Sequence, residues 1–385
     1  MKRLFTIVSM TSVIFAQTSC SQSPKGEAPW IVDRFDDIKV IRYEVPGFDE
    51  LPLEEKELVY YLAEAAKCGR DIFFDQNCAV NLPVRRTLEV VYENYAGDRT
   101  TPEWKALEKY LKKVWFANGI HHHYSNDKFR PEFSESFFRE AAASVGMDRF
   151  PADFDFLCKV IFDPAIYPTR LNQAAGADML WTSASNYYSN VRQHEAEQFY
   201  TAMAAADAGD PCPVSYGLNS QLVKEEKTGR LYERTWKVGG ISSPANERIV
   251  YWLEKARHVA AEPQKQTVAA LIDYYRTGDL KQFDRYNIRW LQDTVSNVDF
   301  VNGFIETYGD PLGYKASWEA NVNFVDSAAC RRTRIISENA QWFEDHSPVD
   351  PAYKKKVVKG VSAKVITVAM LGGDCYPATP IGINL

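Results

Sequence analysis

The chain has 385 residues, which is enough for two lobes or domains. Hydrophobic residues make up 45% of it and aromatic residues 13%, as in packed globular proteins, and this composition excludes a disordered chain. The formal net charge of −6 gives no support to nucleic-acid binding, which requires a basic face, so we expect no nucleic-acid partner.

The N-terminus has the features of an export signal. A basic start precedes a mostly apolar run, residues 4–16, that is too short to span a bilayer. Small residues then precede Cys20. We expect residues 1–20 to be a bacterial lipoprotein signal with lipid on the Cys20 thiol, and residues 21–28 to be a tether. An ordinary secretory signal is the alternative. The expected location is the bacterial cell envelope, lipid-anchored or periplasmic, with the membrane reached only through the lipid anchor.

The first half of the chain carries signals for one strand and two helices. β-Branched residues favour a strand over residues 37–45. Apolar residues at three- and four-residue steps favour a single helix over residues 53–74. Thr101 followed by Pro102 is the N-cap and first-turn pattern of a helix, which we expect to continue through Phe116.

Two histidine motifs invite a metal-binding interpretation. His121, His122 and His123 are adjacent, and successive side chains diverge on a helix or a strand, so a loop lining a cleft is expected instead. His194 is followed by a glutamate, as in the zincin helix, but the second histidine of that motif is replaced by Gln198. We therefore expect an exposed helix face there.

The second half of the chain predicts a hairpin and further helices. Two strand-like runs, residues 215–223 and 230–238, flank a Lys-Thr-Gly turn and predict the hairpin. Apolar stripes predict helices over residues 246–261, 264–277, 327–346 and 352–371.

Residues 299–313 combine a strand signal with two chemically useful side chains. The segment begins with alternating apolar residues and ends in a Gly-Asp-Pro turn signal. If the strand continues through it, Glu306 and Tyr308 project from the same face. A carboxylate can hold a cation, and a phenol can donate a hydrogen bond to a developing oxyanion. A solvated acid and a packed tyrosine at a strand end are the alternative.

The same segment resembles a known family. The motifs are FIETYGDP at residues 304–311 and WEANVNFV at residues 318–325, with further matching blocks at residues 42–48, 58–62, 69–71, 216–220 and 277–290. They resemble the dipeptidyl peptidase III family of zinc exopeptidases, which remove dipeptides from peptide N-termini.

The resemblance implies an α+β fold in which helices wrap a small mixed sheet or partly closed barrel. This lower, substrate-binding lobe would span residues 29–326. Residues 327–371 would begin a helical upper lobe, and residues 372–385 would return as a strand to the lower lobe.

The resemblance also assigns roles to individual residues. Tyr308 would be the catalytic residue that stabilises the oxyanion. Glu306 and Asn384 would hold the N-terminal ammonium of the substrate. Gly382 and Ile383 would lie in the strand beside which an oligopeptide substrate is added as a further β-strand.

The zinc motif of the family, H-E-x-x-G-H, does not occur in the 385 residues. In the family, zinc activates water or polarises the carbonyl, and a glutamate is the general base. We therefore expect the N-terminal, substrate-binding portion of a dipeptidyl peptidase III-like metallopeptidase, which binds no zinc and is inactive alone. Its partners would be the oligopeptide and the missing C-terminal portion with the zinc site. The alternatives are a non-catalytic lipoprotein that binds extended peptides and, from aromatic content, a glycan-binding surface lipoprotein.

Overall fold

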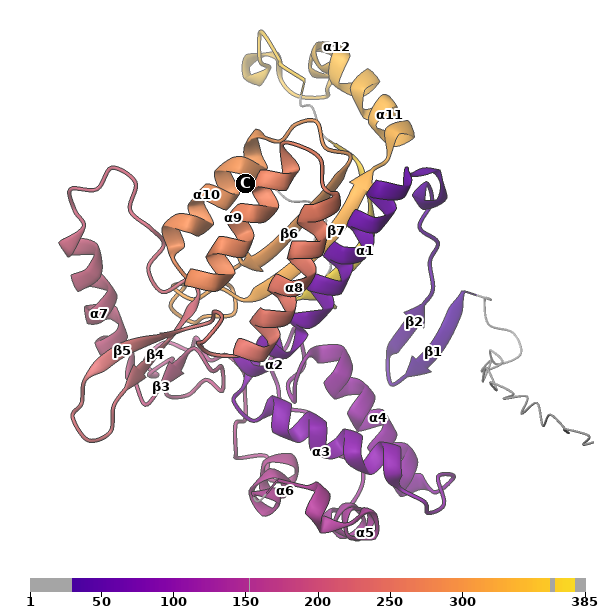
Figure 1. Ribbon diagram of the computed structural model, residues 1–385, viewed down its shortest axis with the longest axis vertical. Helices are drawn as coiled ribbons and strands as arrows, with labels where there is room; N and C mark the ends of the chain where they lie inside the picture. Colours follow the sequence, from indigo (N-terminus) through magenta and orange to yellow (C-terminus); the bar gives the residue numbers. More distant parts are fainter. Residues whose placement is uncertain (1–29, 152, 361–363, 378–385) are drawn as a thin grey trace, which may run out of the picture. The chain divides into compact units, whose positions relative to one another are not determined.

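The computed structural model describes residues 30–151, 153–360 and 364–377 (Figure 1). The expectations for residues 1–28, including Cys20, and for Gly382, Ile383 and Asn384 concern residues outside these ranges. The chain divides into two compact units, residues 1–44 and residues 45–385.

The described part of the first unit is a β-hairpin. Strands β1 (Ile31–Phe35) and β2 (Ile38–Ile41) are antiparallel, and Phe35 pairs with Ile38 across the turn. Asp36 occupies the left-handed region, with φ 51°, which aspartate tolerates better than most residues. The strand predicted over residues 37–45 is confirmed as β2, although β2 ends at Ile41.

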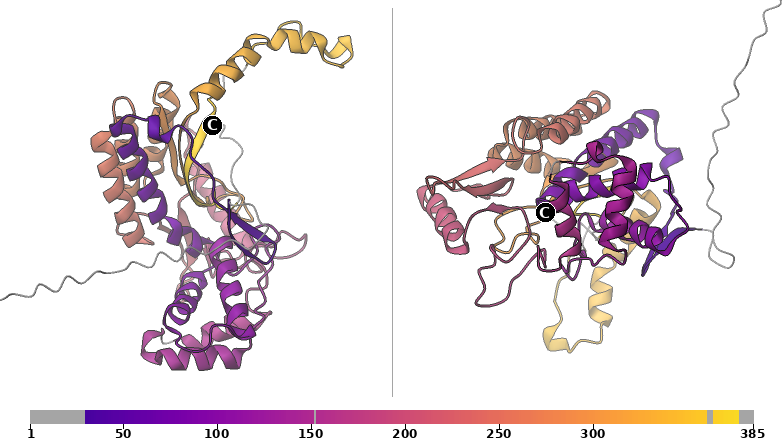
Figure 2. Two further views of the ribbon diagram at one scale, coloured as in Figure 1. Left: turned by 90° about the vertical axis from the view of Figure 1, so that its right-hand side faces the viewer. Right: turned by 90° about the horizontal axis from the view of Figure 1, so that it is seen from below.

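The second unit contains a layer of four helices packed against a three-stranded sheet (Figures 1 and 2). The helices are α1 (Leu53–Cys68), α8 (Ser243–Val259), α9 (Gln264–Thr277) and α10 (Leu280–Gln292). The antiparallel strands, in order, are β6 (Val298–Phe304), β7 (Trp318–Val325) and β8 (Ile366–Gly373). Large side chains such as Phe300, Phe304 and Trp318 are fully buried between the two layers.

A separate helical cluster has its own core. It comprises α2 (Arg70–Asn77), α3 (Asn81–Asn94), α4 (Pro102–Ala117), α5 (Glu135–Val145) and α6 (Phe154–Phe162). The predicted start of α4 is confirmed, because the Thr101 hydroxyl accepts a hydrogen bond from the Trp104 amide at 3.3 Å.

A second small sheet is mixed. Strand β3 (Tyr188–Ser189) is parallel to β4 (Ser220–Lys224), which is antiparallel to β5 (Leu231–Thr235). The predicted hairpin is thus confirmed with shorter strands. Helix α7 (Gln193–Ala206) contributes Ala196 and Tyr200 to the apolar cluster that includes Leu222 of β4.

The segment after β7 is only partly as predicted. Helices α11 (Ser327–Glu338) and α12 (Ala340–His346) confirm the helical expectation for residues 327–346. The helix expected over residues 352–371 is wrong, because the chain there forms β8 beside β7. The apolar run suits either structure, and the β-branched Val365-Ile366-Thr367-Val368 favours the strand once a partner is present.

The α+β class is confirmed. The strands within the described residues form three separate small sheets and no closed barrel. Three short 3₁₀ turns complete the elements: η1 (Phe48–Glu50), η2 (Met147–Arg149) and η3 (Pro351–Tyr353). Across residues 30–151, 153–360 and 364–377, no helix has the length and apolarity of a membrane span.

The single helix expected over residues 53–74 is divided at Gly69. A Cβ atom at this position would lie 2.0 Å from Cζ2 of Trp318, whose side chain is fully buried. Glycine is therefore required where the turn between α1 and α2 meets the indole ring.

Replacement of this glycine tests the close approach. Gly69→Ala should lower the free energy of unfolding by about 1–3 kcal/mol, because the methyl group displaces a buried tryptophan. Urea unfolding followed by tryptophan fluorescence measures the change. Gly209→Ala is the matched control, since a Cβ there meets nothing within 4 Å. Equal stability of the two variants would contradict the proposed close packing.

Candidate functional site

The turn that joins β6 to β7, residues 305–317, begins with an irregular pairing. The Ile305 amide donates to the Ser317 carbonyl at 3.1 Å, and the Ser317 amide donates to the Glu306 carbonyl at 2.8 Å. Two residues of one strand thus oppose one residue of the other, which is the pattern of a β-bulge. A bulge shifts the alternation of side chains, so it changes the direction of Glu306. The expectation that Glu306 and Tyr308 lie on one regular strand is wrong, because β6 ends at Phe304.

Two further carboxyl groups lie within electrostatic range of Glu306. Glu319 is the second residue of β7, and Asp374 directly follows β8. Burial is the main cause that raises the pKa of both groups, and the negative charge of Glu306 adds a smaller rise. We call Glu306, Glu319 and Asp374 the carboxylate cluster.

The register of the sheet explains why these groups meet. Glu319 pairs with Gly303 on one side and with Gly373 on the other. Neither neighbour has a side chain that could pair with Glu319 across the strands. Asp374 is held next to this position because its amide donates to the Trp318 carbonyl at 3.1 Å.

Burial and neighbouring negative charges act against the ionised form of Glu319. Burial, followed by the charges of Asp374 and Glu306, raises the pKa of Glu319 to about 7. Burial also raises the pKa of Asp374, although the Arg170 guanidinium opposes that rise. Arg170 is itself held by hydrogen bonds to Asn77 and Asn126, both at 2.9 Å. The chemistry of the cluster favours a cation that neutralises the repelling carboxylates.

The donor set does not fit a metal ion. Among the described residues, no three His, Cys, Asp or Glu side chains are placed to hold one. The Cys375 thiol instead lies 3.4 Å from a Glu319 oxygen as a hydrogen-bond donor. An organic ammonium binds through hydrogen bonds and needs no fixed coordination geometry.

The other residues singled out in the sequence have different surroundings. Tyr308 is 79% exposed, so its phenol is open to a ligand from solvent. Asn384, Gly382 and Ile383, expected to bind substrate, and Cys20, expected to carry lipid, lie outside the described residues.

The turn is anchored from below by Asp310, which is only 3% exposed. Its carboxylate accepts hydrogen bonds from the amides of Leu312, Tyr314 and Lys315 and from the Tyr188 hydroxyl, at 2.8–3.1 Å. The Gly-Asp-Pro signal thus marks a turn that is stabilised by backbone hydrogen bonds to the side chain of its aspartate.

The three adjacent histidines are held by different contacts. His121 Nε2 lies 2.9 Å from the Tyr167 carbonyl, and burial lowers the pKa of His121 to about 4. His122 Nδ1 accepts hydrogen bonds from the amides of Tyr124 and Ser125. The His123 ring stacks on that of His122, with centroids 4.5 Å apart.

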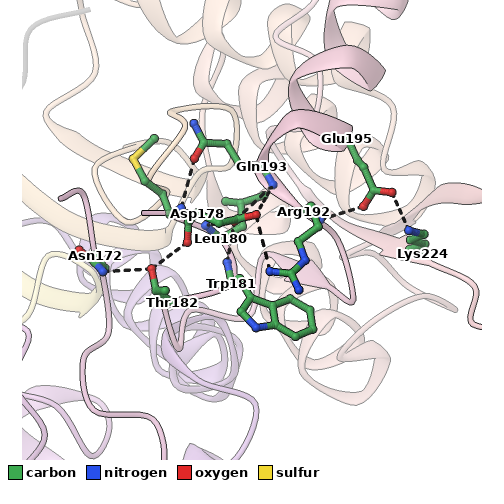
Figure 3. A network of polar contacts seen from close by, with 10 residues as sticks. Asn172, Asp178, Leu180, Trp181, Thr182, Arg192, Gln193, Glu195 and Lys224 are labelled. Carbon is green, nitrogen blue, oxygen red and sulfur yellow. Dashed lines mark hydrogen bonds and ion pairs between the residues drawn. The ribbon is translucent and has the colours of Figure 1, made fainter. Parts of the chain in front are cut away.

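The start of α7 is a capping arrangement, which Figure 3 shows. Glu195 accepts from the Arg192 amide at 2.9 Å and from Lys224 at 2.6 Å. Asp178 accepts from the Trp181 amide, and the Arg192 guanidinium lies 3.7 Å above the Trp181 ring. His194 and Gln198 are exposed, so the expected exposed helix face is confirmed.

Comparison with known proteins identifies the family. Peptidase family M49 matches residues 178–385, more than half of the chain. The chain therefore belongs to peptidase family M49.

Curated relatives and solved structures support this assignment. Dipeptidyl peptidase 3 of Homo sapiens is 27% identical over 192 residues, which cover 50% of this chain and 25% of that protein. Its counterpart in Rattus norvegicus is 28% identical over 169 residues, covering 44% and 22%. The chain thus spans about a quarter of the length of these relatives.

The fold is similar to that of solved DPP III structures. The protein from Caldithrix abyssi has a TM-score of 0.57 at 17% identity, covering 85% of this chain and 50% of that one. The protein from Corallococcus sp. strain EGB has a TM-score of 0.55 at 18% identity, covering 87% and 50%.

The raised pKa of Glu319 predicts a pH dependence of stability. The unfolded chain loses the Glu319 proton near the ordinary pKa of 4.5, whereas the native chain keeps it until about pH 7. The free energy of unfolding should therefore fall as the pH rises from about 4.5 to about 7. Glu319→Gln should therefore raise the free energy of unfolding at pH 8 by about 1–3 kcal/mol and have little effect at pH 4.5.

Urea unfolding at the two pH values measures this difference. Glu226→Gln, at an exposed position in the β4–β5 turn, is the control and should change stability equally little at both. A Glu319→Gln variant with the same pH profile as the wild type would show that Glu319 is not buried among like charges.

Proposed function

We propose that this chain is the peptide-binding part of a dipeptidyl peptidase III-like metallopeptidase. The observation that carries the proposal is the carboxylate cluster, which in a chain of peptidase family M49 offers a place for the N-terminal ammonium of a peptide. Removal of a dipeptide requires that the enzyme locate the free amine and measure two residues from it.

The exposure of each residue suggests its role in binding the peptide. Exposed Glu306 is the first carboxylate that an ammonium meets, and Glu319 and Asp374 add negative potential behind it. Tyr308, exposed on the adjoining turn, is proposed to donate its phenolic hydrogen to the oxyanion that forms at the scissile carbonyl. Asn384 would complete the amine site, and Gly382 and Ile383 would pair with the peptide backbone.

Zinc is proposed to act in the complete enzyme, where it would activate the attacking water or polarise the carbonyl. The described residues of this chain do not fit such a site, since they bring no three suitable ligands together. The metal site is therefore proposed to belong to polypeptide beyond this chain.

Helices α11 and α12 offer a surface for that polypeptide. Several large apolar side chains on and after these helices are exposed by 49–80%: Ile335, Ile336, Trp342, Phe343, Tyr353 and Val357. A contiguous segment with so many exposed apolar groups is typical of a protein interface. We propose that it packs against the metal-bearing part, because this chain covers only half of the solved DPP III chains.

Peptide binding without catalysis is a second candidate. In the sheet order β6-β7-β8, β8 is an outer strand of the described sheet. An extended peptide could add to such an edge through backbone hydrogen bonds. This function would use the same carboxylate cluster and require no metal, and a lipid anchor at Cys20 would hold the protein at the envelope.

Recognition of the amine is tested with matched peptides. Calorimetry at pH 7.5 should show that tetraalanine amide binds more tightly than its N-acetyl form, because acetylation removes the cation. Glu306→Gln should reduce this preference by about tenfold, the loss expected for one charge-assisted hydrogen bond. Glu226→Gln should keep the preference. Equal binding of the acetylated and free peptides by the wild type would rule out the proposed amine site.

The proposal that this chain holds no zinc site is tested by measuring its zinc content. After exposure to zinc and dialysis, the purified chain should retain no stoichiometric zinc by mass spectrometry, because the described side chains supply no set of ligands. It should also release no dipeptide from a diarginyl chromogenic amide. One tightly held zinc per chain, together with dipeptide release, would instead place the catalytic centre within this polypeptide.

A further inference from the structure

A buried lysine connects the turn that carries Glu306 and Tyr308 to the second small sheet. Lys315 is 0% exposed, although lysine is rarely buried without a charged partner. Its Nζ donates to the Ser220 hydroxyl at 3.0 Å and to the Tyr200 hydroxyl, and lies 3.4 Å from Glu233.

The partners of Lys315 form a closed network. Glu233 on β5 accepts hydrogen bonds from the hydroxyls of Tyr200 at 2.7 Å and Ser220 at 2.5 Å, so one carboxylate oxygen collects three donors. The Tyr200 ring also stacks on Tyr314 of the turn, with centroids 4.5 Å apart. The network therefore joins the turn to α7, β4 and β5.

The neighbouring backbone is fixed in the same way. The Ala316 amide donates to the Leu218 carbonyl at 2.9 Å, and the Ala316 carbonyl accepts from the Gln76 side chain at 3.0 Å. Gln76 in turn accepts from the Trp318 amide at 2.7 Å. The C-terminal half of the turn is thus held from two sides, whereas Glu306 and Tyr308 in its first half are exposed.

We propose that Lys315, through Tyr200, Ser220 and Glu233, is a positioning residue that holds the turn in the conformation that binds the peptide amine. This inference rests on the proposed function. Because Lys315 is fully buried, its effect would be transmitted through the backbone between Lys315 and Glu306.

The charge of Lys315 is sensitive to pH. Burial lowers its pKa to about 8, against the opposing charges of Glu233 and Asp310. The other titratable groups that face it are phenols: Tyr188, whose ring lies 5.6 Å from Nζ, and Tyr200. Burial raises the pKa of both phenols, so they remain neutral where the lysine titrates. Affinity for a cationic N-terminus should therefore fall as the pH rises through about 8.

The test uses a peptide whose own charge does not change in this range. N-amidino-tetraalanine amide carries a guanidinium that stays protonated, unlike an α-amine. Calorimetry from pH 7.5 to 9.5 should show its affinity falling through about pH 8 for the wild type. In Glu233→Gln the fall should occur at lower pH, because the carboxylate that raises the pKa of Lys315 is gone.

Two further variants separate positioning from folding. Lys315→Met should reduce the preference for the free over the acetylated peptide by about tenfold in protein that circular dichroism shows to be folded. Val114→Ala removes buried volume in the separate helical cluster and should lower stability without changing that preference. If Lys315→Met does not fold, the pH profile of Glu233→Gln tests the inference instead. This variant keeps an acceptor oxygen for the hydroxyls of Tyr200 and Ser220.

The outcomes are distinct. A shifted pH profile in Glu233→Gln, with the preference unchanged in Val114→Ala, supports the inference. An unchanged pH profile in a folded Glu233→Gln variant overturns it while leaving the amine site intact. A wild type without any preference for a cationic N-terminus overturns the proposed function itself.

Discussion

The hydrogen-bonded ladder of β6, β7 and β8 is the constraint on which the site depends. Its register sets Glu319 between two glycines and places Asp374, which directly follows β8, beside it. Like charges repel and burial removes water from them, and both effects favour a protonated Glu319. A bound cation would offset the repulsion between these charges, and this is the physical basis of the proposed ammonium site.

The supports around the ladder are of two kinds. On one side, fully buried aromatic rings such as Phe300 and Trp318 hold the sheet against the helical layer through apolar packing. On the turn, the buried carboxylate of Asp310 and the ammonium of Lys315 fix the backbone through hydrogen bonds. Apolar packing tolerates small adjustments, whereas a buried ion pair requires a defined geometry. The buried ion pair of Lys315 lies on the turn that carries the candidate site.

Local patterns in the sequence predicted much of the fold but only part of the site. The N-cap at Thr101 and the β4–β5 hairpin depend on neighbouring residues and were predictable. Strand β8 was not, because its apolar run suits a helix equally well until β7 supplies a partner. Glu319 lies within the motif WEANVNFV and Asp374 in none, and the two meet only through strand pairing. The signal that could have revealed Glu319 is an acid inside the otherwise apolar or amide-bearing strand WEANVNFV.

The structural similarity reaches further along the chain than the family match. Peptidase family M49 matches residues 178–385, whereas the DPP III structure from Caldithrix abyssi covers 85% of the chain. The earlier helices are thus part of the shared fold, which agrees with the packing of α1 against all three strands of the β6–β8 sheet.

Proton release on peptide binding tests the central claim most directly. At pH 6 Glu319 is largely protonated and a peptide amine is fully charged, so a bound ammonium should lower the pKa of Glu319 and expel a proton. Titration calorimetry of tetraalanine amide in two buffers of different ionisation enthalpy reports that proton. Release of a substantial fraction of one proton, absent in Glu319→Gln, is the predicted result. Binding with no proton release would contradict the placement of the ammonium at the carboxylate cluster.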